Sequence, residues 1–523
     1  MGKSDSVRWI GVLIVWGIVF SLVGAIVFKS IIKPGHNRQI EALTSGKSRY
    51  DHEITINLDS FSGYSILRSE AFKEELNAAR IRLNIKDDNA DYGQRIKELE
   101  AGKCQFAVFT VDSLIVSSVE LGIWPGTIIL GIDESHGADA VVAYKNSIPN
   151  LNSLNDPQAR LVLTPNSPSE FMARIITAHF SLKSLAKNYV EPADGSTKVY
   201  EKFIKAGPAD KKAYIMWEPD VSKALEQPGS HILLDSSKIK GHIVDVLVVQ
   251  RKFLADHQDI VGKTVEAYLR AAYCYRNDMV ELIIKDAKAG GGSLTRGQAE
   301  KIVKGILWKN SIENYAHFGL LDKSETKGID HMEDIIQKIT AVLVNTAAIE
   351  SDPFYGNYNK LFYDKILEAL KKNNFHPGRK INILADDIGL LDKEDMRGYI
   401  ELPPLTDKQW QQLVPVGKME INPVSFGRGK STIGIQSRRE IEDLAKKLRS
   451  WSSYYLVIVG HSRKEGDQEL NRELARQRSQ EVRNYLVNEC GISSDRIKAK
   501  SAKVFTRAGE GQSVSFVVGQ TPY

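Results

Sequence analysis

GHSRKEGDQELNRELARQRSQEV, residues 460–482, joins a polar loop to a long helical pattern. Before it stands YYLVIVG (454–460), a short apolar run typical of a buried strand. Leu470, Leu474, Arg478 and Val482 recur at four-residue intervals and therefore share one helix face, an apolar stripe that Arg478 interrupts. Either its head group reaches water at the edge of this apolar stripe, or its planar guanidinium is kept to receive an anion such as a carboxylate.

This stretch is the centre of an α/β pattern that fills residues 417–523. A strand-like segment (MEINPVSF, 419–426) and an amphipathic helix precede it, and another strand (SVSFVVG, 513–519) follows. The resulting βαβαβ order resembles the OmpA-like peptidoglycan-binding domain. The residues that carry the resemblance are Gly460-His461-Ser462, Asn471, Leu474, Arg478, Val482, Gly491-Ile492 and Arg496-Ile497.

The resemblance implies a peptidoglycan site that includes Ser462, Asn471 and Arg478. In that family the helix arginine takes the carboxylate of a diaminopimelate side chain, and an acid in the loop takes its ammonium. Arg463 stands where this acid is expected, which removes a charged hydrogen bond of about 1.5 to 3 kcal/mol, or roughly ten- to a hundredfold in affinity. The same loop offers two other acids, Glu465 and Asp467. Peptidoglycan binding therefore stays an open expectation.

At the other end of the chain, WIGVLIVWGIVFSLVGAIVF (9–28) contains no charged residue. At about 1.5 Å per residue it spans roughly 30 Å, the thickness of a bilayer's hydrocarbon core. A signal peptide has a shorter apolar region and a small-residue cleavage site, so we expect a retained membrane helix between a cytoplasmic tip (1–8) and a polar tether (29–52). Small residues recur along it at the spacing of helix dimers, which makes a homodimer a candidate: Gly17, Ser21 and Ala25.

The composition excludes several classes of protein. The 523 residues are too many for one ordinary core and indicate several domains. A net charge of +5 is too dilute for a nucleic-acid surface. The cysteines at 104, 274 and 490 form no C-x-x-C pair, and no residue set suits a metal, a cofactor or nucleophilic catalysis. We therefore expect a protein that is not an enzyme.

Residues 53–330 alternate short apolar runs with amphipathic helical patterns, which predicts an α/β module with a mainly parallel sheet. The expected strands are 54–58, 106–111, 127–132, 140–144, 159–164, 212–217 and 244–249. Several of them lead into Ser-, Thr-, Gly- and Asp-rich turns. Such turns gather at the carboxyl ends of the strands, where ligands bind, but every turn also needs a helix cap, so a structural role stays open for each.

The order of these pieces resembles periplasmic solute-binding proteins of the taurine, nitrate and thiamine-precursor type. The resemblance is carried by Ser62-Gly63-Tyr64, GKCQFAVFT (102–110), DESHGAD (133–139) and Trp217-Glu218-Pro219. It implies two lobes, residues 53–138 with 245–330 and residues 139–244, which close on a small polar solute about hinges near 138–142 and 238–245. Carried over by position, the ligand-binding residues are Ser62, Tyr64, Thr110, Asp112, Asp133, Ser135, Ser167 and Trp217.

The whole chain is thus expected to be a single-pass inner-membrane protein with its bulk in the periplasm. A helical connector (331–416) would join the solute-binding-like module to the OmpA-like domain (417–523). The expected function is binding of a small polar solute and contact with the cell wall. The alternative is a dimeric structural or stator-like scaffold for a membrane partner, with a vestigial solute pocket. A stator's ion path needs an acid in the membrane helix, and none is present in residues 9–28.

Overall fold

The computed structural model describes residues 50–321, 329–378, 402–418, 424–427, 429–451, 453–461, 466–502 and 513–521. The membrane helix expected at 9–28 lies outside these residues. The chain divides into two compact units, residues 1–53 with 77–82 and residues 54–76 with 83–523. In the first unit Arg80 pairs with Asp51 at an Nε–Oδ2 distance of 2.7 Å. The second unit holds nearly all of the described helices and strands.

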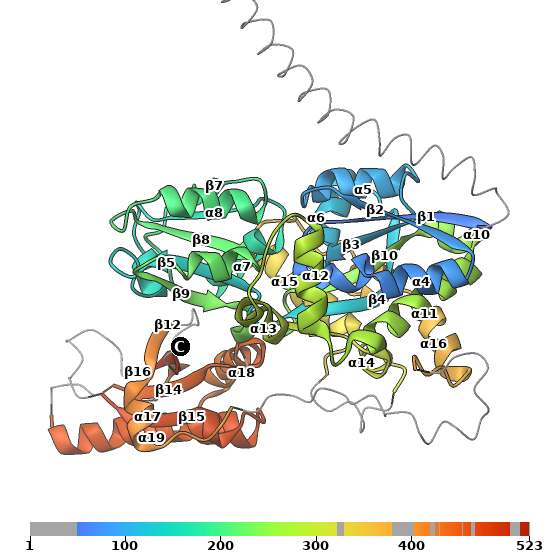
Figure 1. Cartoon of the computed structure of the whole chain (residues 1–523). Coiled ribbons are helices and arrows are strands. Elements are labelled where there is room, and N and C mark those ends of the chain that lie inside the picture. Colours follow the sequence, from blue (N-terminus) through green and yellow to red (C-terminus); the bar gives the residue numbers. More distant parts are fainter. Residues whose placement is uncertain are drawn as a thin grey trace, which may run out of the picture. The chain divides into compact units, whose positions relative to one another are not determined.

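A six-stranded sheet has the strand order β11-β4-β10-β3-β1-β2 (Figure 1). Its strands are β1 (His52–Leu58), β2 (Ile81–Asp87), β3 (Phe106–Thr110), β4 (Gly126–Ser135), β10 (Val244–Gln250) and β11 (Ile306–Trp308). Strands β3 and β4 are buried along their whole length, as their near-continuous apolar sequences require.

The helices of this lobe cluster in two segments of the chain. They are η2 (Ser62–Tyr64), α3 (Ser65–Arg68), α4 (Glu70–Ala78), α5 (Tyr92–Glu100), α6 (Val111–Leu121), α10 (Arg251–Asp256), α11 (Gln258–Tyr275), α12 (Met279–Ala289), α13 (Arg296–Lys304) and α14 (Ser311–His317). Helix α6 directly continues β3 and stops at Gly122, whose φ of 78° is the left-handed conformation that favours glycine at a helix end.

A five-stranded sheet forms the other lobe, in the order β7-β6-β8-β5-β9 (Figure 1). Its elements are β5 (Asp139–Tyr144), η3 (Leu151–Leu154), β6 (Arg160–Leu163), α7 (Pro168–His179), β7 (Val190–Pro192), α8 (Gly195–Lys205), β8 (Lys212–Trp217), α9 (Asp220–Ala224), β9 (Ser230–Asp235) and η4 (Ser236–Lys238). Its core includes a stacked pair, Tyr144 and Phe203, with ring centroids 4.8 Å apart. The two-lobed architecture implied by the resemblance is therefore confirmed.

The prediction of a mainly parallel sheet is wrong. Strand β10 is antiparallel to both β3 and β4, and β5 is antiparallel to both β8 and β9. These two strands are the ones by which the chain enters each lobe from the other. They do not arrive through a βαβ crossover within their own sheet, so nothing requires a parallel orientation.

The chain passes between the two sheets twice, at residues 135–139 and 235–244. The first crossing is braced by Gly305, the residue before β11. Its carbonyl accepts hydrogen bonds from the backbone N–H groups of His136 at 2.8 Å and Ala138 at 3.2 Å. The first crossing is thus attached to β11.

The second crossing is held by a buried ion pair. Glu134, near the end of β4, accepts a hydrogen bond from the backbone N–H of Gly241 through Oε1 at 2.7 Å. Its Oε2 lies 2.9 Å from the Nζ of Lys309, which follows β11. Both crossings are therefore connected to the β4 and β11 strands, near the positions expected for hinges.

Part of the segment expected as a helical connector packs on the six-stranded lobe. It contains α15 (Met332–Asn345), η5 (Tyr358–Leu361) and α16 (Lys365–Lys372). The Tyr363 backbone N–H donates to the carbonyl of Ile128 at 2.8 Å, and the Thr127 hydroxyl donates to the carbonyl of Leu361 at 3.1 Å. Further along the chain stand α17 (Asp407–Gln412) and β12 (Val414–Lys418).

The C-terminal sheet has the order β12-β16-β14-β15, with β13 also paired to β16. Its remaining elements are β13 (Val424–Ser425), α18 (Ile435–Ser450), β14 (Tyr455–Gly460), α19 (Gln468–Asn488), η7 (Ser494–Arg496), β15 (Ile497–Ser501) and β16 (Ser513–Gln520). Helix α19 connects the parallel strands β14 and β15. The sequence pattern does not predict β15. Its sequence, IKAKS, alternates lysines with apolar residues and therefore has the weak hydrophobicity of an edge strand.

Gly460 ends β14 at a close approach to α19. A Cβ at this position would lie 1.9 Å from the carbonyl oxygen of Ala475. Since that atom belongs to the helix backbone, no side-chain rotation relieves the clash. The glycine of the opening stretch is therefore needed for packing the helix on the strand.

We expect Gly460→Ala to destabilise the C-terminal domain by about 1 to 3 kcal/mol or more, because the helix must move away from the strand. Chemical denaturation followed by the fluorescence of Trp451, the one tryptophan in residues 417–523, measures this. Gly434→Ala is the matched control, since a Cβ there meets no atom within 4 Å. Equal denaturation midpoints for the two variants would contradict the close approach.

Candidate functional site

One row of residues crosses the six-stranded sheet where the chain leaves for the other lobe. In register, Thr110 of β3 lies opposite Asp245 of β10, which lies opposite Asp133 of β4, which lies opposite Trp308 of β11. Side chains at opposite positions of paired strands are neighbours, with Cβ atoms about 4.5 to 5.5 Å apart. The register therefore places two carboxyl groups side by side inside the sheet.

Both carboxyls of this pair are buried. The Tyr64 hydroxyl, from η2, donates a hydrogen bond to Oδ1 of Asp245. Neither oxygen of Asp133 receives a hydrogen bond from the residues that the structure describes. The two carboxyls lie within hydrogen-bonding reach of each other, but that bond forms only when one of them holds a proton.

Gly63 makes room for the Asp133 side chain. A Cβ at residue 63 would lie 2.4 Å from the Oδ2 atom of Asp133. The Trp308 indole N–H fixes the same turn by donating to the carbonyl of Gly63 at 2.8 Å. The turn after β1 is thus shaped around the carboxyl group.

Two further carboxyls lie nearby: Asp139 interacts electrostatically with both members of the pair, and Asp112 interacts with Asp139. Asp112 stands in the first turn of α6, and Asp139 begins β5 of the other lobe. Both are buried, and Oδ1 of Asp112 accepts no hydrogen bond from the described part of the chain. The Asp139 backbone N–H donates to the Ser135 hydroxyl at 3.2 Å. The cluster therefore has members from both lobes.

Burial raises the pKa of all four carboxyls. It brings the pKa of Asp112 and of Asp139 to about 7, with smaller contributions from neighbouring acids. It brings that of Asp133 to about 8, and it places the pKa of Asp245 well above its usual value, with the charge of Asp133 as the next cause. Near neutral pH part of this cluster is protonated, since four adjacent buried charges are too costly.

Other buried acids close by have basic partners. Arg95, itself fully buried, binds Asp59 through Nη2 at 2.9 Å and Asp88 through Nε at 2.7 Å. Lys309 pairs with Glu134, and although burial raises the pKa of that carboxyl, the lysine charge holds it at about 2. The four-carboxyl cluster of Asp112, Asp133, Asp139 and Asp245 differs because, within the described part of the chain, no Lys or Arg forms an ion pair with it.

Four of the residues expected to bind ligand meet in or beside this cluster: Tyr64, Thr110, Asp112 and Asp133. Ser135 lies in the first crossing, where its hydroxyl is 2.7 Å from that of Ser236. Trp217 lies opposite Asp139 in register, at the end of β8. The structure thus gathers six of the eight around the crossings.

The remaining two expected residues have local roles. The Ser62 carbonyl accepts a hydrogen bond from the Ser65 hydroxyl at 2.7 Å, within the turn that carries Tyr64. Ser167 caps α7, where its hydroxyl accepts from the Ser169 N–H at 3.2 Å and donates to the carbonyl of Thr164 at 2.6 Å. Both contacts are typical of turn and cap residues.

Sequence reasoning missed Asp139 and Asp245 as site residues. A signal for the second was present, because VDVLVV is otherwise a fully apolar strand and an acid inside such a run is costly unless it has a purpose. Asp139 closes the DESHGAD segment but had no distinguishing pattern of its own.

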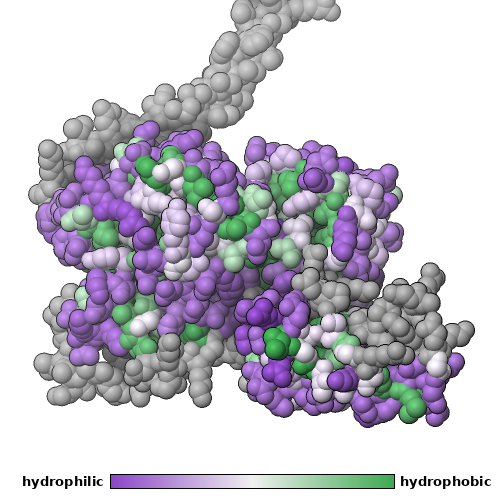
Figure 2. Space-filling model, turned by 180° about the vertical axis from the view of Figure 1, so that it is seen from behind, coloured by the Kyte–Doolittle hydropathy of each residue, from purple (hydrophilic) through white to green (hydrophobic). Residues whose placement is uncertain are grey.

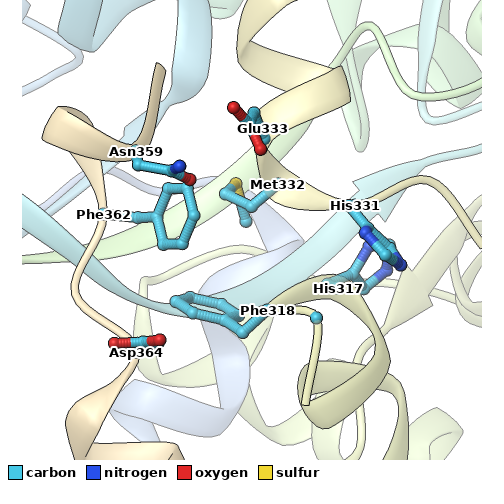
Figure 3. Close-up of a pocket in the computed structure, with 9 residues that line it drawn as sticks. His317, Phe318, His331, Met332, Glu333, Asn359, Phe362 and Asp364 are labelled. Atoms are coloured by element: carbon cyan, nitrogen blue, oxygen red, sulfur yellow. The ribbon is translucent and has the colours of Figure 1, made fainter. Parts of the chain in front are cut away.

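A separate cavity of about 250 Å³ lies in the same lobe, among α14, α15 and η5. Figure 3 shows the rings of Phe318 and Phe362 within it and two histidines together on one side. His317 lies with Nδ1 2.7 Å from the carbonyl of Asp330, and burial lowers its pKa to about 4, so it is neutral at pH 7. No set of three metal-binding side chains occurs among the described residues.

In the C-terminal domain Arg478 is almost fully buried, with 1% of its surface exposed. Its Nε donates to the carbonyl of Lys430 at 2.8 Å and its Nη2 to that of Gly427 at 3.0 Å. The guanidinium carbon lies 5.1 Å from the ring centroid of Phe426. Among the described residues, the guanidinium of Arg478 is bound by the backbone carbonyls of a loop and does not reach water at the edge of the apolar stripe.

The other parts of the expected peptidoglycan site are less fully described. Ser462, Arg463 and Glu465 lie outside the described residues. Asp467, one of the alternative acids, is the N-cap of α19, where its Oδ1 accepts from two backbone N–H groups at 2.9 and 3.0 Å. Asn471 follows in the first turn of that helix, with its Nδ2 near Gly466.

Comparison with known proteins agrees with the C-terminal fold. Residues 425–512 match the model of the OmpA family. Outer membrane protein Omp38 of Acinetobacter baumannii is 33% identical over 101 residues, which cover 19% of this chain and 28% of that protein. The chain therefore spans less than a third of this relative's length. The C-terminal part of the chain is an OmpA-like domain.

Solved structures similar to the two-lobed module include the nitrate-binding protein NrtA from Synechocystis, with 10% identity, a TM-score of 0.48 and coverage of 64% of this chain and 90% of that chain. The aliphatic sulphonate binding protein SsuA from Escherichia coli has 14% identity, a TM-score of 0.43 and coverage of 60% and 92%. The two-lobed fold itself is defined by the strand orders and the two crossings. Within the described ranges, no helix has the length and apolar character needed to cross a bilayer.

The cluster gives the stability of the protein a definite pH dependence. An unfolded Asp has a pKa near 3.9, whereas these four carboxyls keep protons to higher pH in the fold. Through these four carboxyls the folded state binds more protons than the unfolded state between about pH 4 and 8, so their contribution to stability falls as pH rises through this window.

We expect the ligand-free protein to melt at a higher temperature at pH 5.5 than at pH 8.0, with up to about 1.4 kcal/mol lost per pH unit and carboxyl. Asp133→Asn should reduce this difference, since it removes one titrating group. Asp156→Asn is the control, because Asp156 forms a surface ion pair with Lys211 and its pKa is lowered by that contact. An unchanged pH slope in Asp133→Asn would show that the pair does not titrate there.

Proposed function

We propose that this protein binds a small polar solute in its two-lobed module and contacts peptidoglycan through its OmpA-like domain. Solute binding is supported by one observation: buried polar groups with incomplete hydrogen bonding lie together at the two crossings. A ligand at this position would contact both lobes. The observation that carries the second half is the OmpA family match with its helix arginine retained at position 478.

The cellular setting follows from the N-terminal sequence. The uncharged segment at 9–28 supports a single inner-membrane helix, with the two modules in the periplasm. The protein would then hold its solute-binding module between membrane and wall. It acts by binding and not by catalysis, since the cluster at the crossings has acids but no nucleophile with an adjacent base.

Wall binding requires an exchange of hydrogen bonds at Arg478. The carbonyls of Gly427 and Lys430 now accept from the guanidinium, and a diaminopimelate carboxylate would have to replace at least one of them. A carboxylate bound by the fork of an arginine gives a stronger, charge-assisted bond than a neutral carbonyl does. The exchange is therefore favourable once the loop moves.

A pull-down of the full-length protein with purified peptidoglycan tests this contact. We expect Arg478→Lys to lower retention about tenfold or more, because lysine lacks the planar fork. Arg463→Asp should raise retention by supplying the acid for the ligand ammonium. Arg476→Ala is the matched control, since this exposed arginine of the same helix forms a surface ion pair with Glu473.

Circular dichroism confirms that each variant retains its fold. Equal retention of wild type, Arg478→Lys and Arg463→Asp would remove the arginine from any wall site. Loss of retention in Arg476→Ala alone would point to a different face of α19.

Solute binding is tested by native mass spectrometry and a thermal-shift screen against small polar molecules. We expect at least one class to raise the melting temperature by several degrees, as a ligand at a hundredfold its Kd stabilises by about 2.7 kcal/mol. A protein that responds to no solute but co-purifies tightly with a membrane protein would instead be a scaffold, the alternative function. The hydrophilic face in Figure 2, with apolar residues in small separate groups, gives no extended docking surface in that view.

A further inference from the structure

We propose that the solute carries a primary ammonium group, which the carboxyl pair Asp133 and Asp245 receives. This inference rests on the proposed solute-binding function and narrows it to cationic or zwitterionic amines. The structural observation behind it is the Asp133 side chain, which is completely buried and has no donor within the described chain except a proton shared with Asp245.

The carboxyl pair Asp133 and Asp245 has no basic side chain paired with it in the described chain. The same lobe neutralises its other buried acids with side chains of its own, as Arg95 does for Asp59 and Asp88. A buried carboxylate without a donor costs several kcal/mol, so a position that keeps one serves something outside the fold. Without solute, bound protons neutralise the carboxyl groups of the cluster. When the solute binds, its ammonium group replaces these protons.

The hydrogen-bond acceptors of the carboxyl pair match the N–H donors of an ammonium group. Asp133 offers two free oxygens, and Asp245, opposite in register, offers the oxygen that does not accept from Tyr64. An ammonium group has three N–H donors and no acceptor. It can therefore satisfy this set without leaving one of its own protons unpaired.

Acids from both lobes contribute to this site. Asp139, which belongs to the five-stranded lobe, adds negative charge beside the pair, and Asp112 interacts with Asp139. A cation at the pair is attracted from both lobes at once, which favours their closure around it. A second amine on the same solute would have Asp112 and Asp139 as partners, so diamines should bind more tightly than monoamines.

The geometry also disfavours two other kinds of ligand. An anion would meet several acids, and the neighbouring bases Arg95 and Lys309 are already paired with other acids. A divalent metal ion needs a converging set of ligands, and among the described residues no group of three His, Cys, Asp or Glu side chains is so placed. An organic amine needs only directional hydrogen bonds.

Calorimetric titration of the full-length protein in detergent tests the inference with ethanolamine, putrescine and agmatine as amines. Taurine, nitrate, glucose and calcium chloride serve as comparison ligands. We expect the amines to bind, putrescine more tightly than ethanolamine. Asp133→Asn and Asp245→Asn should each weaken amine binding about ten- to a hundredfold, the loss expected for one charged hydrogen bond.

Asp156→Asn, on the surface of the other lobe, is the control and should bind as wild type does. Both cluster variants are isosteric and remove a buried charge, so a cooperative melting curve confirms that they fold. Amine binding that is equal in Asp133→Asn, Asp245→Asn and wild type would overturn the inference, because the amine would then lie elsewhere.

Two further outcomes separate this inference from the function on which it rests. Binding of nitrate, taurine, glucose or calcium without any amine binding would overturn the ammonium site and leave solute binding intact. Absence of binding by every ligand, together with a negative thermal-shift screen, would overturn both.

Discussion

The cost of placing two carboxyl groups opposite each other inside a sheet governs the organisation of the first module. Asp133 and Asp245 lie in register on neighbouring strands, with water excluded. In a low-dielectric interior like charges at that spacing repel strongly, so one proton or one external cation must accompany the pair. The surrounding features serve this requirement: a glycine at 63 that leaves space, a tyrosine that donates to one oxygen, and basic residues that are paired elsewhere.

Much of the fold could be predicted from sequence because it depends on short apolar runs. All seven strands expected in the first module are present within a few residues of their predicted ends. The strands that were missed, such as β2 (Ile81–Asp87) and β15, carry polar residues at half or more of their positions. Strand direction could not be predicted, because it depends on which lobe the chain comes from and not on local pattern.

The candidate site was less predictable than the fold. Of the residues expected from their position after a strand, Tyr64, Asp112 and Asp133 lie in or near the carboxyl cluster, whereas the hydroxyl of Ser167 is used in a helix cap. Asp245 was overlooked because its partner lies 112 positions earlier in the chain and meets it only through the sheet register. At the other end of the protein, a four-residue repeat singled out Arg478 but placed Leu470 on the same buried stripe, where the structure leaves it 70% exposed. Helix periodicity predicts which residues share one face of a helix. Whether each of them is buried depends on which other element packs against that part of the face.

The attachment of both crossings to β4 and β11 has a mechanical meaning. A pair of bare connecting strands would allow the lobes to twist, bend and slide against each other. Here the Gly305 carbonyl clamps one connection and the Glu134–Lys309 ion pair clamps the other. Both contacts join the connecting segments to β4 and β11, two neighbouring strands at one edge of the six-stranded sheet. The two connections between the lobes are therefore anchored at the same edge of that sheet.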